Sequence, residues 1–171
     1  LLLSHFPSDT LLVANEVIRT RIPALKENIQ RWGFPNAVIT YADPADFEAL
    51  CETFDLIVVD APCSGSGLFR RDAEAIKEWS EDNVQLCSQR QQRILADAGN
   101  CLKDDGVLIY STCSYSFEED EKIMDYIASL DGMTSVNIQL PSSSPIVTTY
   151  SPIHQAQGFR FYPDKIKGEG F

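Results

Sequence analysis

The stretch FDLIVVDAPCSGSG, residues 54–67, decides the fold. It opens with an apolar run that is typical of a buried strand, and Asp60 closes that run. Cys63 follows in a loop whose glycines let the backbone turn sharply and approach a ligand closely. A second stretch, YSTCSYSFEEDE at residues 110–121, also ends an apolar run and places Cys113 just beyond it. In open α/β sheets, ligands bind outside the carboxyl ends of the strands, so both thiols are expected at that edge.

Strand-like and helical patterns alternate along the rest of the chain. Strands are predicted at residues 11–15, 37–41, 54–59, 107–110, 136–140 and 159–162, and helices at 21–32, 44–51, 73–79, 81–102 and 117–131. Thr20 and Ser80 are predicted to cap helices, Ser116 and Glu119 to form a capping box, and Asp105-Gly106 to form a turn. Residues 141–157 read as a loop. The alternation predicts an α/β fold: a doubly wound, mostly parallel sheet with a late antiparallel strand.

Composition narrows the class of protein. The 171 residues suffice for one domain, and their content of 44% apolar and 23% charged residues is ordinary for a globular protein. A net charge of −11 argues against a surface that coats nucleic acid, although a local basic groove remains compatible with it. No apolar run is long enough to span a membrane. Five cysteines without a Cys-x-x-Cys pair argue against a metal site or a disulfide framework and favour a reducing, cytoplasmic location.

Acidic residues stand at three successive strand ends: Glu16, Asp43 and Asp60. In doubly wound folds, a carboxylate at such a position can accept hydrogen bonds from ribose hydroxyls. For Asp43, which precedes Pro44, helix capping is an equally good explanation. The series as a whole favours a cofactor that contains a nucleoside.

The cysteines fall into two groups. Cys51, Cys87 and Cys101 lie in helical patterns and are predicted to be small buried hydrophobes. Cys63 and Cys113 lie at turns from strand to loop, where backbone amides can stabilise a thiolate. Position alone leaves both catalysis and simple burial open for these two.

The motifs Asp-Ala-Pro-Cys-Ser-Gly (60–65) and Tyr-Ser-Thr-Cys-Ser (110–114), with Glu-Glu-Asp-Glu (118–121) after them, resemble the Sun-type RNA (cytosine-5) methyltransferases. The resemblance covers nearly the whole chain and extends to Gly-Phe-Arg-Phe-Tyr-Pro at 158–163 and Gly-Glu-Gly-Phe at 168–171. It implies a Rossmann-like class I methyltransferase fold, S-adenosyl-L-methionine as the cofactor, and ribosomal or transfer RNA as the partner. It implies neither a metal nor a membrane.

The resemblance also implies residue roles. Cys113 is similar to the thiol that attacks C6 of cytosine, and Cys63 to the cysteine that assists elimination of the product. Asp60 is similar to the carboxylate that binds the base edge and is also expected near the cofactor, whose ribose and adenine Glu16 and Asp43 would contact. Pro62, Arg70 and Arg71 are expected on the substrate side.

Members of this family carry a glycine-rich cofactor loop, with a lysine, upstream of the segment where this chain begins. Residues 1–171 are therefore expected to be a single partial, N-terminally truncated domain that lacks its first strand and is inactive in isolation. The acidic run 118–121 is attributed mainly to the dipole of the following helix. Two rivals remain: a non-catalytic RNA-binding or assembly module, and a cysteine hydrolase, which would need a histidine near the thiol although only His5 and His154 are present.

Overall fold

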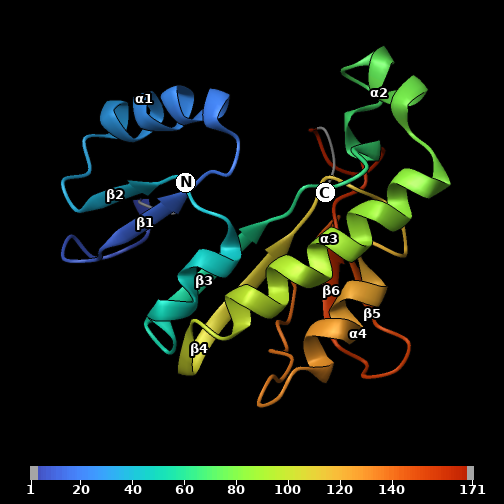
Figure 1. The fold of residues 1–171 in the computed structure, drawn as a ribbon. Coiled ribbons are helices and arrows are strands. Elements are labelled where there is room, and N and C mark those ends of the chain that lie inside the picture. The colour runs from blue at the N-terminus through green and yellow to red at the C-terminus, as the bar shows by residue number, and fades with distance from the viewer. Residues whose placement is uncertain (1–3, 169–171) are drawn as a thin grey trace. The chain divides into compact units, whose positions relative to one another are not determined.

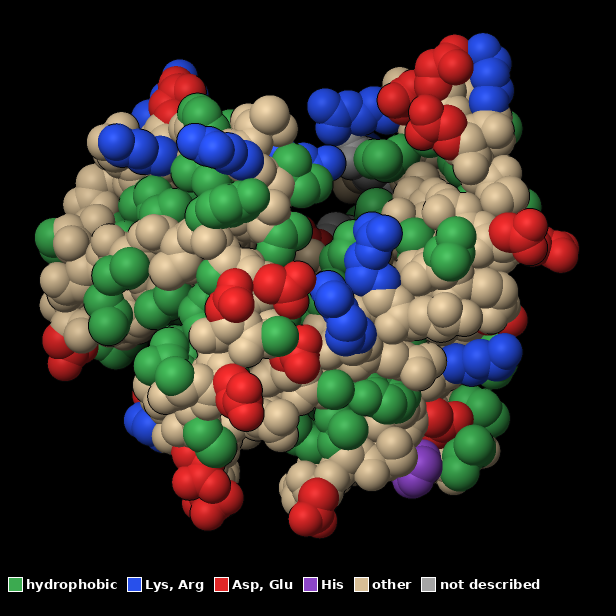
Figure 2. Space-filling model, in the orientation of Figure 1, with side chains coloured by type: hydrophobic (Ala, Val, Ile, Leu, Met, Phe, Trp, Pro, Cys, Tyr) green, Lys and Arg blue, Asp and Glu red, His purple; other side chains and the backbone are tan. Residues whose placement is uncertain are grey.

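The computed structural model describes residues 4–168 of the chain (Figure 1). It contains two compact units, Leu1–Ala49 and Leu50–Phe171, each of which has its own strands and helices. The two units are described separately below. None of the helices in the described part is both long and apolar enough to cross a membrane. Acidic and basic side chains are interspersed on the face shown in Figure 2.

The first unit is built on one parallel strand pair. Strand β1 (Leu12–Asn15) pairs in parallel with β2 (Ala37–Thr40), and the 3-10 turn η2 (Arg19–Arg21) and helix α1 (Ile22–Trp32) connect them. Gly33 ends α1 in the left-handed region, at φ 71°, as predicted. The prediction of Thr20 as the cap is wrong, because Thr20 lies inside η2 and no side chain caps α1. After β2 the chain enters the 3-10 helix η3 (Pro44–Leu50).

The second unit begins with the strands that carry the cysteine loops. Strand β3 (Phe54–Asp60) pairs in parallel with β4 (Leu102–Ser111). The 3-10 turn η4 (Ser66–Leu68), helix α2 (Ala73–Glu78) and helix α3 (Glu81–Gly99) connect them. Ser80 caps α3, as predicted: its side chain accepts a hydrogen bond from the Asn83 N–H. In Figure 1, α3 runs along the β3–β4 pair.

Strand β4 is longer than predicted and irregular. Phe54 pairs with Leu102, but Leu56 already pairs with Val107, so β4 carries extra residues between these two points. Asp105 adopts φ 63° inside this bulge. The predicted Asp-Gly turn is therefore a local distortion within the strand, and regular pairing resumes at Val107.

The last part of the second unit is an antiparallel hairpin that follows helix α4 (Glu121–Ser129) along the chain. Strand β5 (Val147–Tyr150) pairs with β6 (Gln157–Arg160), so the late antiparallel strand is confirmed. Its partner is not the predicted strand at 136–140, which does not form; there the backbone of Ile138 bonds to the Gln157 side chain instead. Strand β5 lies within residues 141–157, which were predicted to be a loop. The strand was missed because serines and prolines precede its Val-Thr-Thr-Tyr run.

The core of the second unit lies between the β3–β4 pair and its two helices. Val59, Leu95 and Ile123 are buried in contact with one another. On the alternate face, Val58 and Ile109 remain 38% and 44% exposed. Two of the three strand pairs are parallel, which confirms a mixed, mostly parallel α/β fold. Within residues 4–168, however, the pairs form three separate two-stranded sheets and not the single sheet that was predicted.

Candidate active site

Two parallel strands deliver both cysteines to the same edge of their sheet. Asp60 and Ser111 are the last paired residues of β3 and β4, and just beyond them the Ala61 N–H donates to the Ser111 carbonyl at 2.9 Å. Because the strands are parallel, the backbone leaves both of them at the same end of the sheet and enters neighbouring loops. Cys63 and Cys113 lie within three residues of that end. The expected convergence of the two loops is therefore present.

The two thiols are in direct contact. The Sγ atoms of Cys63 and Cys113 lie 2.9 Å apart, and both are free, half-buried cysteines. With Cys63 as the donor, the hydrogen bond to Cys113 raises the pKa of Cys63, and burial raises it further. The same hydrogen bond lowers the pKa of Cys113 against the opposing effect of burial. Cys113 is therefore the sulfur that ionises first, and a thiolate is the nucleophilic form of cysteine.

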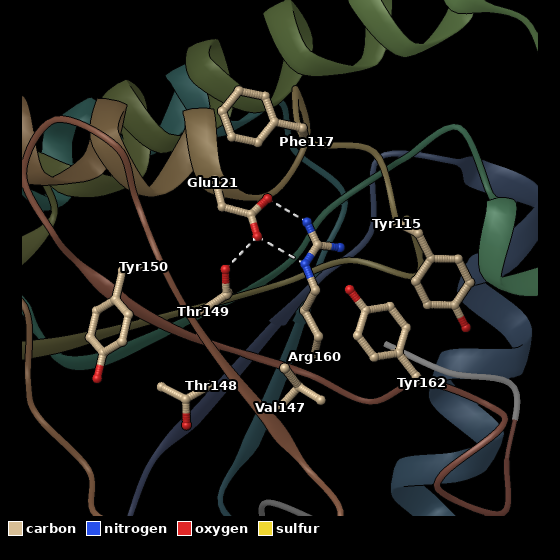
Figure 3. Close-up of a pocket in the computed structure, with 9 residues that line it drawn as sticks. All are labelled: Tyr115, Phe117, Glu121, Val147, Thr148, Thr149, Tyr150, Arg160 and Tyr162. Carbon is tan, nitrogen blue, oxygen red and sulfur yellow. Dashed lines mark hydrogen bonds and ion pairs between the residues drawn. The ribbon is translucent and has the colours of Figure 1, made fainter.

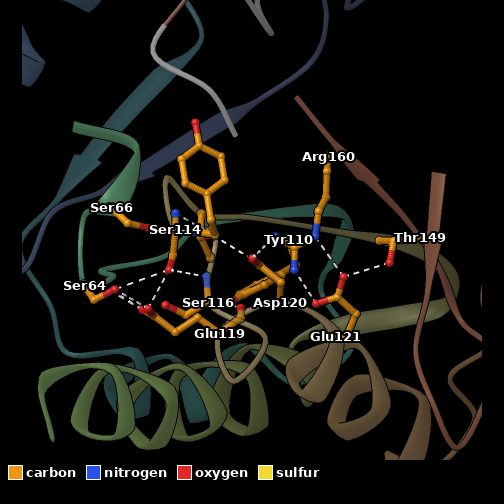
Figure 4. A network of polar contacts seen from close by, with 12 residues as sticks. Ser64, Ser66, Tyr110, Ser114, Ser116, Glu119, Asp120, Glu121, Thr149 and Arg160 are labelled. Carbon is orange, nitrogen blue, oxygen red and sulfur yellow. Dashed lines mark hydrogen bonds and ion pairs between the residues drawn. The ribbon is translucent and has the colours of Figure 1, made fainter. Parts of the chain in front are cut away.

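A buried carboxylate lies behind the thiols. Glu119 is fully buried, and its Oε1 accepts hydrogen bonds from the Ser64 N–H at 2.9 Å and from Gln91 Nε2 at 3.0 Å. Its Oε2 accepts from the Ser114 hydroxyl at 2.6 Å and from the Ser64 hydroxyl. Gln91 also donates to the carbonyl of Pro62 at 2.9 Å. Figure 4 shows Ser64 and Ser114, one from each loop, pointing at this one side chain.

The capping box predicted for Ser116 and Glu119 is wrong. Helix α4 begins at Glu121 after Asp120, which makes no side-chain cap, and the Glu119 side chain is engaged with residues from other elements. The predicted interaction of the acidic run with the helix dipole likewise does not account for Glu119, because its carboxylate binds Ser64 and Ser114. The signal that could have revealed its role is the serine after each cysteine, Ser64 and Ser114, because each offers a hydroxyl donor beside its thiol.

The next two acidic residues, Asp120 and Glu121, form an ion cluster with Arg160 (Figure 4). Arg160 Nη1 lies 2.8 Å from Asp120, Nε lies 2.9 Å from Glu121, and Arg160 as a whole is 8% exposed. Asp120 also accepts from the Thr112 hydroxyl at 2.9 Å, next to Cys113. Burial raises the pKa of Asp120 to about 7, although Arg160 and the Thr112 hydrogen bond oppose this rise. For Glu121, burial is outweighed by hydrogen bonds from Arg160 and Thr149, which hold its pKa below the usual value.

Backbone contacts also join the two loops. The Gly67 N–H donates to the Cys113 carbonyl at 2.6 Å, and the Tyr115 N–H donates to the Ser66 hydroxyl at 2.8 Å. A Cβ at position 67 would lie 2.5 Å from the Cys113 carbonyl oxygen. Glycine is therefore required at Gly67 for this close approach.

Asp60 and Pro62 flank the thiols on the strand side. Asp60 is exposed and accepts a long hydrogen bond, 3.4 Å, from the Ser111 hydroxyl. The ring of Pro62 is exposed, while its carbonyl is held by Gln91. Both residues therefore lie at the surface of the strand edge that carries the two cysteines.

The two arginines after the Cys63 loop have different surroundings. Arg70 Nη1 donates to the carbonyls of Pro163 at 3.0 Å and Gly168 at 3.4 Å, so it ties the end of the described chain to this loop. Arg71 is exposed, and its backbone N–H donates to the Leu68 carbonyl. Sequence reasoning did not anticipate the structural contacts of Arg70.

Glu16 and Asp43 lie in the first unit, at the carboxyl edge of the β1–β2 pair. Glu16 Oε1 accepts from the Ile18 N–H at 2.7 Å. Asp43 accepts from the Ala45 N–H at 3.2 Å, which is the capping arrangement considered for it. Asn15, which the sequence did not single out, joins the two strand ends by accepting from the Thr40 hydroxyl and the Ala42 N–H.

The remaining cysteines and the histidines lie apart from the thiol pair. Cys87 and Cys101 are buried, as predicted, but Cys51 is exposed, because it follows η3 in a surface turn. His154 contacts Asp125 at 3.3 Å, and His5 contacts Ser4. Within residues 4–168, no group of three or more potential metal ligands is present.

A separate open pocket of about 380 Å³ lies beside the ion cluster (Figure 3). Glu121 and Arg160 line it together with Tyr115, whose ring stacks on Tyr162 with centroids 5.9 Å apart. Neither Cys63 nor Cys113 lines this pocket. The thiol pair and the pocket are therefore neighbouring but distinct features of the second unit.

Comparison with solved structures supports the fold. A crystal structure of PH0851 matches with a TM-score of 0.74 and 26% identity, over 89% of this chain and 36% of that one. NSun6 from Pyrococcus horikoshii with SFG matches with a TM-score of 0.65 and 25% identity, over 89% of this chain and 40% of that one. The chain therefore shares its fold with methyltransferases of the Sun type.

Sequence comparison gives the family. A protein of Psychromonas ingrahamii named ribosomal RNA small subunit methyltransferase F is 36% identical over 163 residues, which are 94% of this chain. The chain spans about a third, 33%, of the length of that curated relative. The family model described as 16S rRNA methyltransferase RsmB/F matches residues 2–171. The resemblance to the Sun-type enzymes is thus confirmed, and the chain belongs to the 16S rRNA methyltransferase RsmB/F family.

Proposed function

We propose that this chain carries the thiol centre of an S-adenosyl-L-methionine-dependent methyltransferase that modifies C5 of cytosine in small-subunit ribosomal RNA. The observation that carries the proposal is the contact of Cys63 and Cys113 at 2.9 Å, in which the pKa of Cys113 is lowered. A centre of this chemistry needs one ionised sulfur and a second group that handles a proton. The pair supplies both within one site.

The first step would use the Cys113 thiolate. Its sulfur forms a bond to C6 of the cytosine, and the electrons of the C5–C6 double bond move towards C5, which becomes nucleophilic. S-adenosyl-L-methionine, when bound, supplies an electrophilic methyl group. Asp60, exposed at the same strand edge, would bind the N3/N4 edge of the base and stabilise the adduct as a hydrogen-bond donor if it is protonated.

Cys63 would act in the second step. Its hydrogen bond to ionised Cys113 raises the pKa of Cys63 and keeps it protonated. Once Cys113 is a neutral thioether, this cause disappears, and Cys63 becomes easier to ionise. Cys63 would lose its proton to solvent, and the resulting thiolate would take the proton from C5. The C5–C6 double bond would then form again, and the bond between Cys113 and C6 would break with its electron pair returning to the Cys113 sulfur. The same contact thereby sets the order in which the two sulfurs act.

The first unit supplies groups that fit the nucleoside end of the cofactor. Glu16 and Asp43 place carboxylates, which accept hydrogen bonds from hydroxyl and amino groups, at the carboxyl edge of two parallel strands. Within a Rossmann-like, doubly wound fold, Glu16 and Asp43 would bind the ribose and adenine of the cofactor. The bond from Ala45 to Asp43 shows that capping and cofactor binding would have to share this carboxylate.

RNA is the proposed partner, and the cytoplasm the proposed location. The target base must leave its stack to reach Cys113. Pro62, with its exposed ring, and Arg71, in the exposed segment after the loop, would contact the displaced nucleotide and its phosphate. Arg70 would act mainly through the chain segment that it already binds. The name of the Psychromonas relative, a ribosomal RNA small subunit methyltransferase, favours ribosomal over transfer RNA.

One pair of variants tests the proposal in the full-length protein, with small-subunit ribosomal RNA and a labelled methyl donor. Cys113→Ala should abolish methyl transfer and form no covalent complex. Cys63→Ala should still attack the base but release it slowly, so a protein–RNA adduct should persist on a denaturing gel. Wild-type activity in Cys113→Ala would overturn the assignment of the nucleophile.

The same experiment addresses the two rivals. A non-catalytic RNA-binding or assembly module predicts that the wild-type protein binds RNA but transfers no methyl group and forms no adduct. A cysteine hydrolase would need a histidine beside the thiol, whereas in the described chain His154 contacts Asp125 and His5 contacts Ser4. Cys87→Ala serves as a control, because Cys87 is a buried cysteine of helix α3 outside the thiol pair.

A further inference from the structure

We propose that Glu119 is a positioning residue that holds the Cys63 and Cys113 loops together, so that the two sulfurs stay in contact. The proposal deepens the proposed function and rests on it for its effect on catalysis. The side-chain hydrogen bonds of Glu119 go to Ser64, Ser114 and Gln91, and not to the sulfurs. It acts through the residue that follows each cysteine: Ser64 after Cys63, and Ser114 after Cys113.

Four donors converge on the carboxylate of Glu119. Ser64 binds it twice, through its backbone N–H and its hydroxyl, and Ser114 binds it through its hydroxyl. Gln91 of helix α3 supplies the fourth donor and also holds the Pro62 carbonyl, just before Cys63. An ionised carboxylate accepts on both oxygens and donates nothing, so it suits this set of donors.

Burial makes the arrangement hard to open. Glu119 is fully buried, and a buried charge is tolerated only when its hydrogen bonds are made. If either loop moved away, part of the carboxylate would lose its donors without gaining water. Ser64 and Ser114 also lie within 3.3 Å of each other through their hydroxyls. The positions of the two loops are therefore coupled through one side chain.

Glu119 is itself held in place by the strand that carries Cys113. The Tyr110 hydroxyl, from β4, donates to the Glu119 carbonyl at 2.7 Å, and the Glu119 N–H donates to the Ser116 carbonyl at 3.0 Å. The next residue, Asp120, holds the Thr112 hydroxyl on the other side of Cys113. The backbone of Glu119 is thus held in place on the Cys113 side, while its carboxylate binds the Cys63 loop.

A direct test measures the thiol contact without RNA or cofactor. Dibromobimane, which joins two thiols only when they are close, should cross-link Cys63 to Cys113 rapidly in the full-length protein, as read by mass spectrometry. Ser114→Ala and Glu119→Asp should slow this cross-link, because the first removes a donor and the second shortens the reach of the carboxylate. Glu119→Gln keeps the length and an acceptor oxygen, and should restore much of the rate.

The matched control is Ser151→Ala. Ser151 is as fully buried as Ser114, and its hydroxyl accepts a hydrogen bond from the Ala156 N–H in the β5–β6 connection, which includes neither cysteine loop. It should lose a similar hydrogen bond yet cross-link at the wild-type rate. If Ser114→Ala and Ser151→Ala cross-link equally fast at equal folded fraction, the positioning role is rejected.

Kinetics provide the second measurement. A thiol pair that is misplaced by about 1 Å should lower kcat on the order of 10²-fold, while the KM for RNA stays close to its wild-type value. A loss of folded protein alone would lower the active fraction without slowing the cross-link in the protein that remains folded. Normal cross-linking in all Glu119 variants would reject the positioning role and leave the methyltransferase proposal intact. If the wild-type protein transfers no methyl group but the Glu119 variants still cross-link slowly, the methyltransferase proposal is rejected and the positioning role is kept.

Discussion

The backbone N–H of Gly67 donates to the carbonyl of Cys113 at 2.6 Å, so the loop after one cysteine lies directly against the other cysteine. A side chain at position 67 would meet that carbonyl at 2.5 Å. The contact joins segments that leave two parallel strands, and the hydrogen bonds of Glu119 join them a second time. The thiol centre is thus a property of two loops held together and not of either motif alone.

Gly67→Ala should separate the loops. The new methyl group cannot fit against the Cys113 carbonyl, so we expect a loss of about 1–3 kcal/mol in the free energy of unfolding, together with slower cross-linking of the two thiols. Urea unfolding and dibromobimane labelling would measure the two effects. Gly99→Ala is the control, because a Cβ there makes only ordinary contact, 3.7 Å from Leu130. Equal stability of the two variants would contradict the close approach.

The reactivity of Cys113 towards iodoacetamide should extend to lower pH than that of an ordinary cysteine. The thiolate is the reacting form, and the hydrogen bond from Cys63, opposed by burial, lowers the pKa of Cys113. Cys63→Ala removes this donor and should move the pH profile of Cys113 alkylation to higher pH. Cys63→Ser keeps a donor and should move it less. An unchanged profile in Cys63→Ala would show that the contact does not activate Cys113.

Arg160→Met should strongly destabilise the protein. It removes the partner of Asp120 and Glu121 in a buried cluster, where breaking an ion pair costs about 3–5 kcal/mol. Lys77→Met is the control, since its 2.6 Å pair with Glu74 is exposed and such pairs contribute about 1 kcal/mol or less. Chemical denaturation at neutral pH measures the free energy of unfolding of both variants. Equal losses would mean that the buried cluster stabilises the protein no more than an exposed ion pair does.

The contribution of Glu121 to the free energy of unfolding should decrease at low pH. Its folded pKa lies below the unfolded value of about 4.3, because hydrogen bonds from Arg160 and Thr149 outweigh the effect of burial. A depressed acid pKa adds stability that is complete above the unfolded pKa and is lost as the pH falls through the folded one. Glu121→Gln should therefore be less stable than the wild type at neutral pH, and the gap should narrow below about pH 4. Unfolding curves across this range would show whether the gap narrows.

Arg71→Gln should weaken RNA binding with little dependence on sequence. A lost phosphate contact lowers the slope of log affinity against log salt by about one. Fluorescence anisotropy of the full-length protein with ribosomal RNA fragments at several salt concentrations measures the slope. Lys77→Gln removes an exposed charge of helix α2 that is not among the proposed RNA contacts, and should change the slope less. An unchanged slope in Arg71→Gln would remove this residue from the proposed RNA contacts.

Much of the fold was predictable because its signals are local. The apolar runs that become β1, β2, β3 and the later half of β4 are short, continuous and closed by polar residues, as buried parallel strands are. Ser80 as a cap and Gly33 as a stop depend on neighbouring residues, so both were readable. Strand β5 was missed, because its run is short and follows a segment rich in serine and proline.

The acidic run shows where local reasoning fails. A helix-dipole explanation suits any acidic residue before a helix, and the sequence places Glu119, Asp120 and Glu121 there together. Their actual partners are distant: Ser64 lies 55 residues from Glu119, and Arg160 lies 39 residues from Glu121. No periodicity records such pairings, because they depend on which loops the folded sheet brings together.

The sequence by itself determined that two cysteines follow two apolar strands, because the apolar runs and the loop residues after them are local features of the sequence. Tertiary structure alone decided that the sulfurs meet at 2.9 Å, and that Glu119 is buried and bonded to both loops. The physical reason is that burial and hydrogen-bond geometry depend on parallel pairing across fifty residues, and pKa values follow from both.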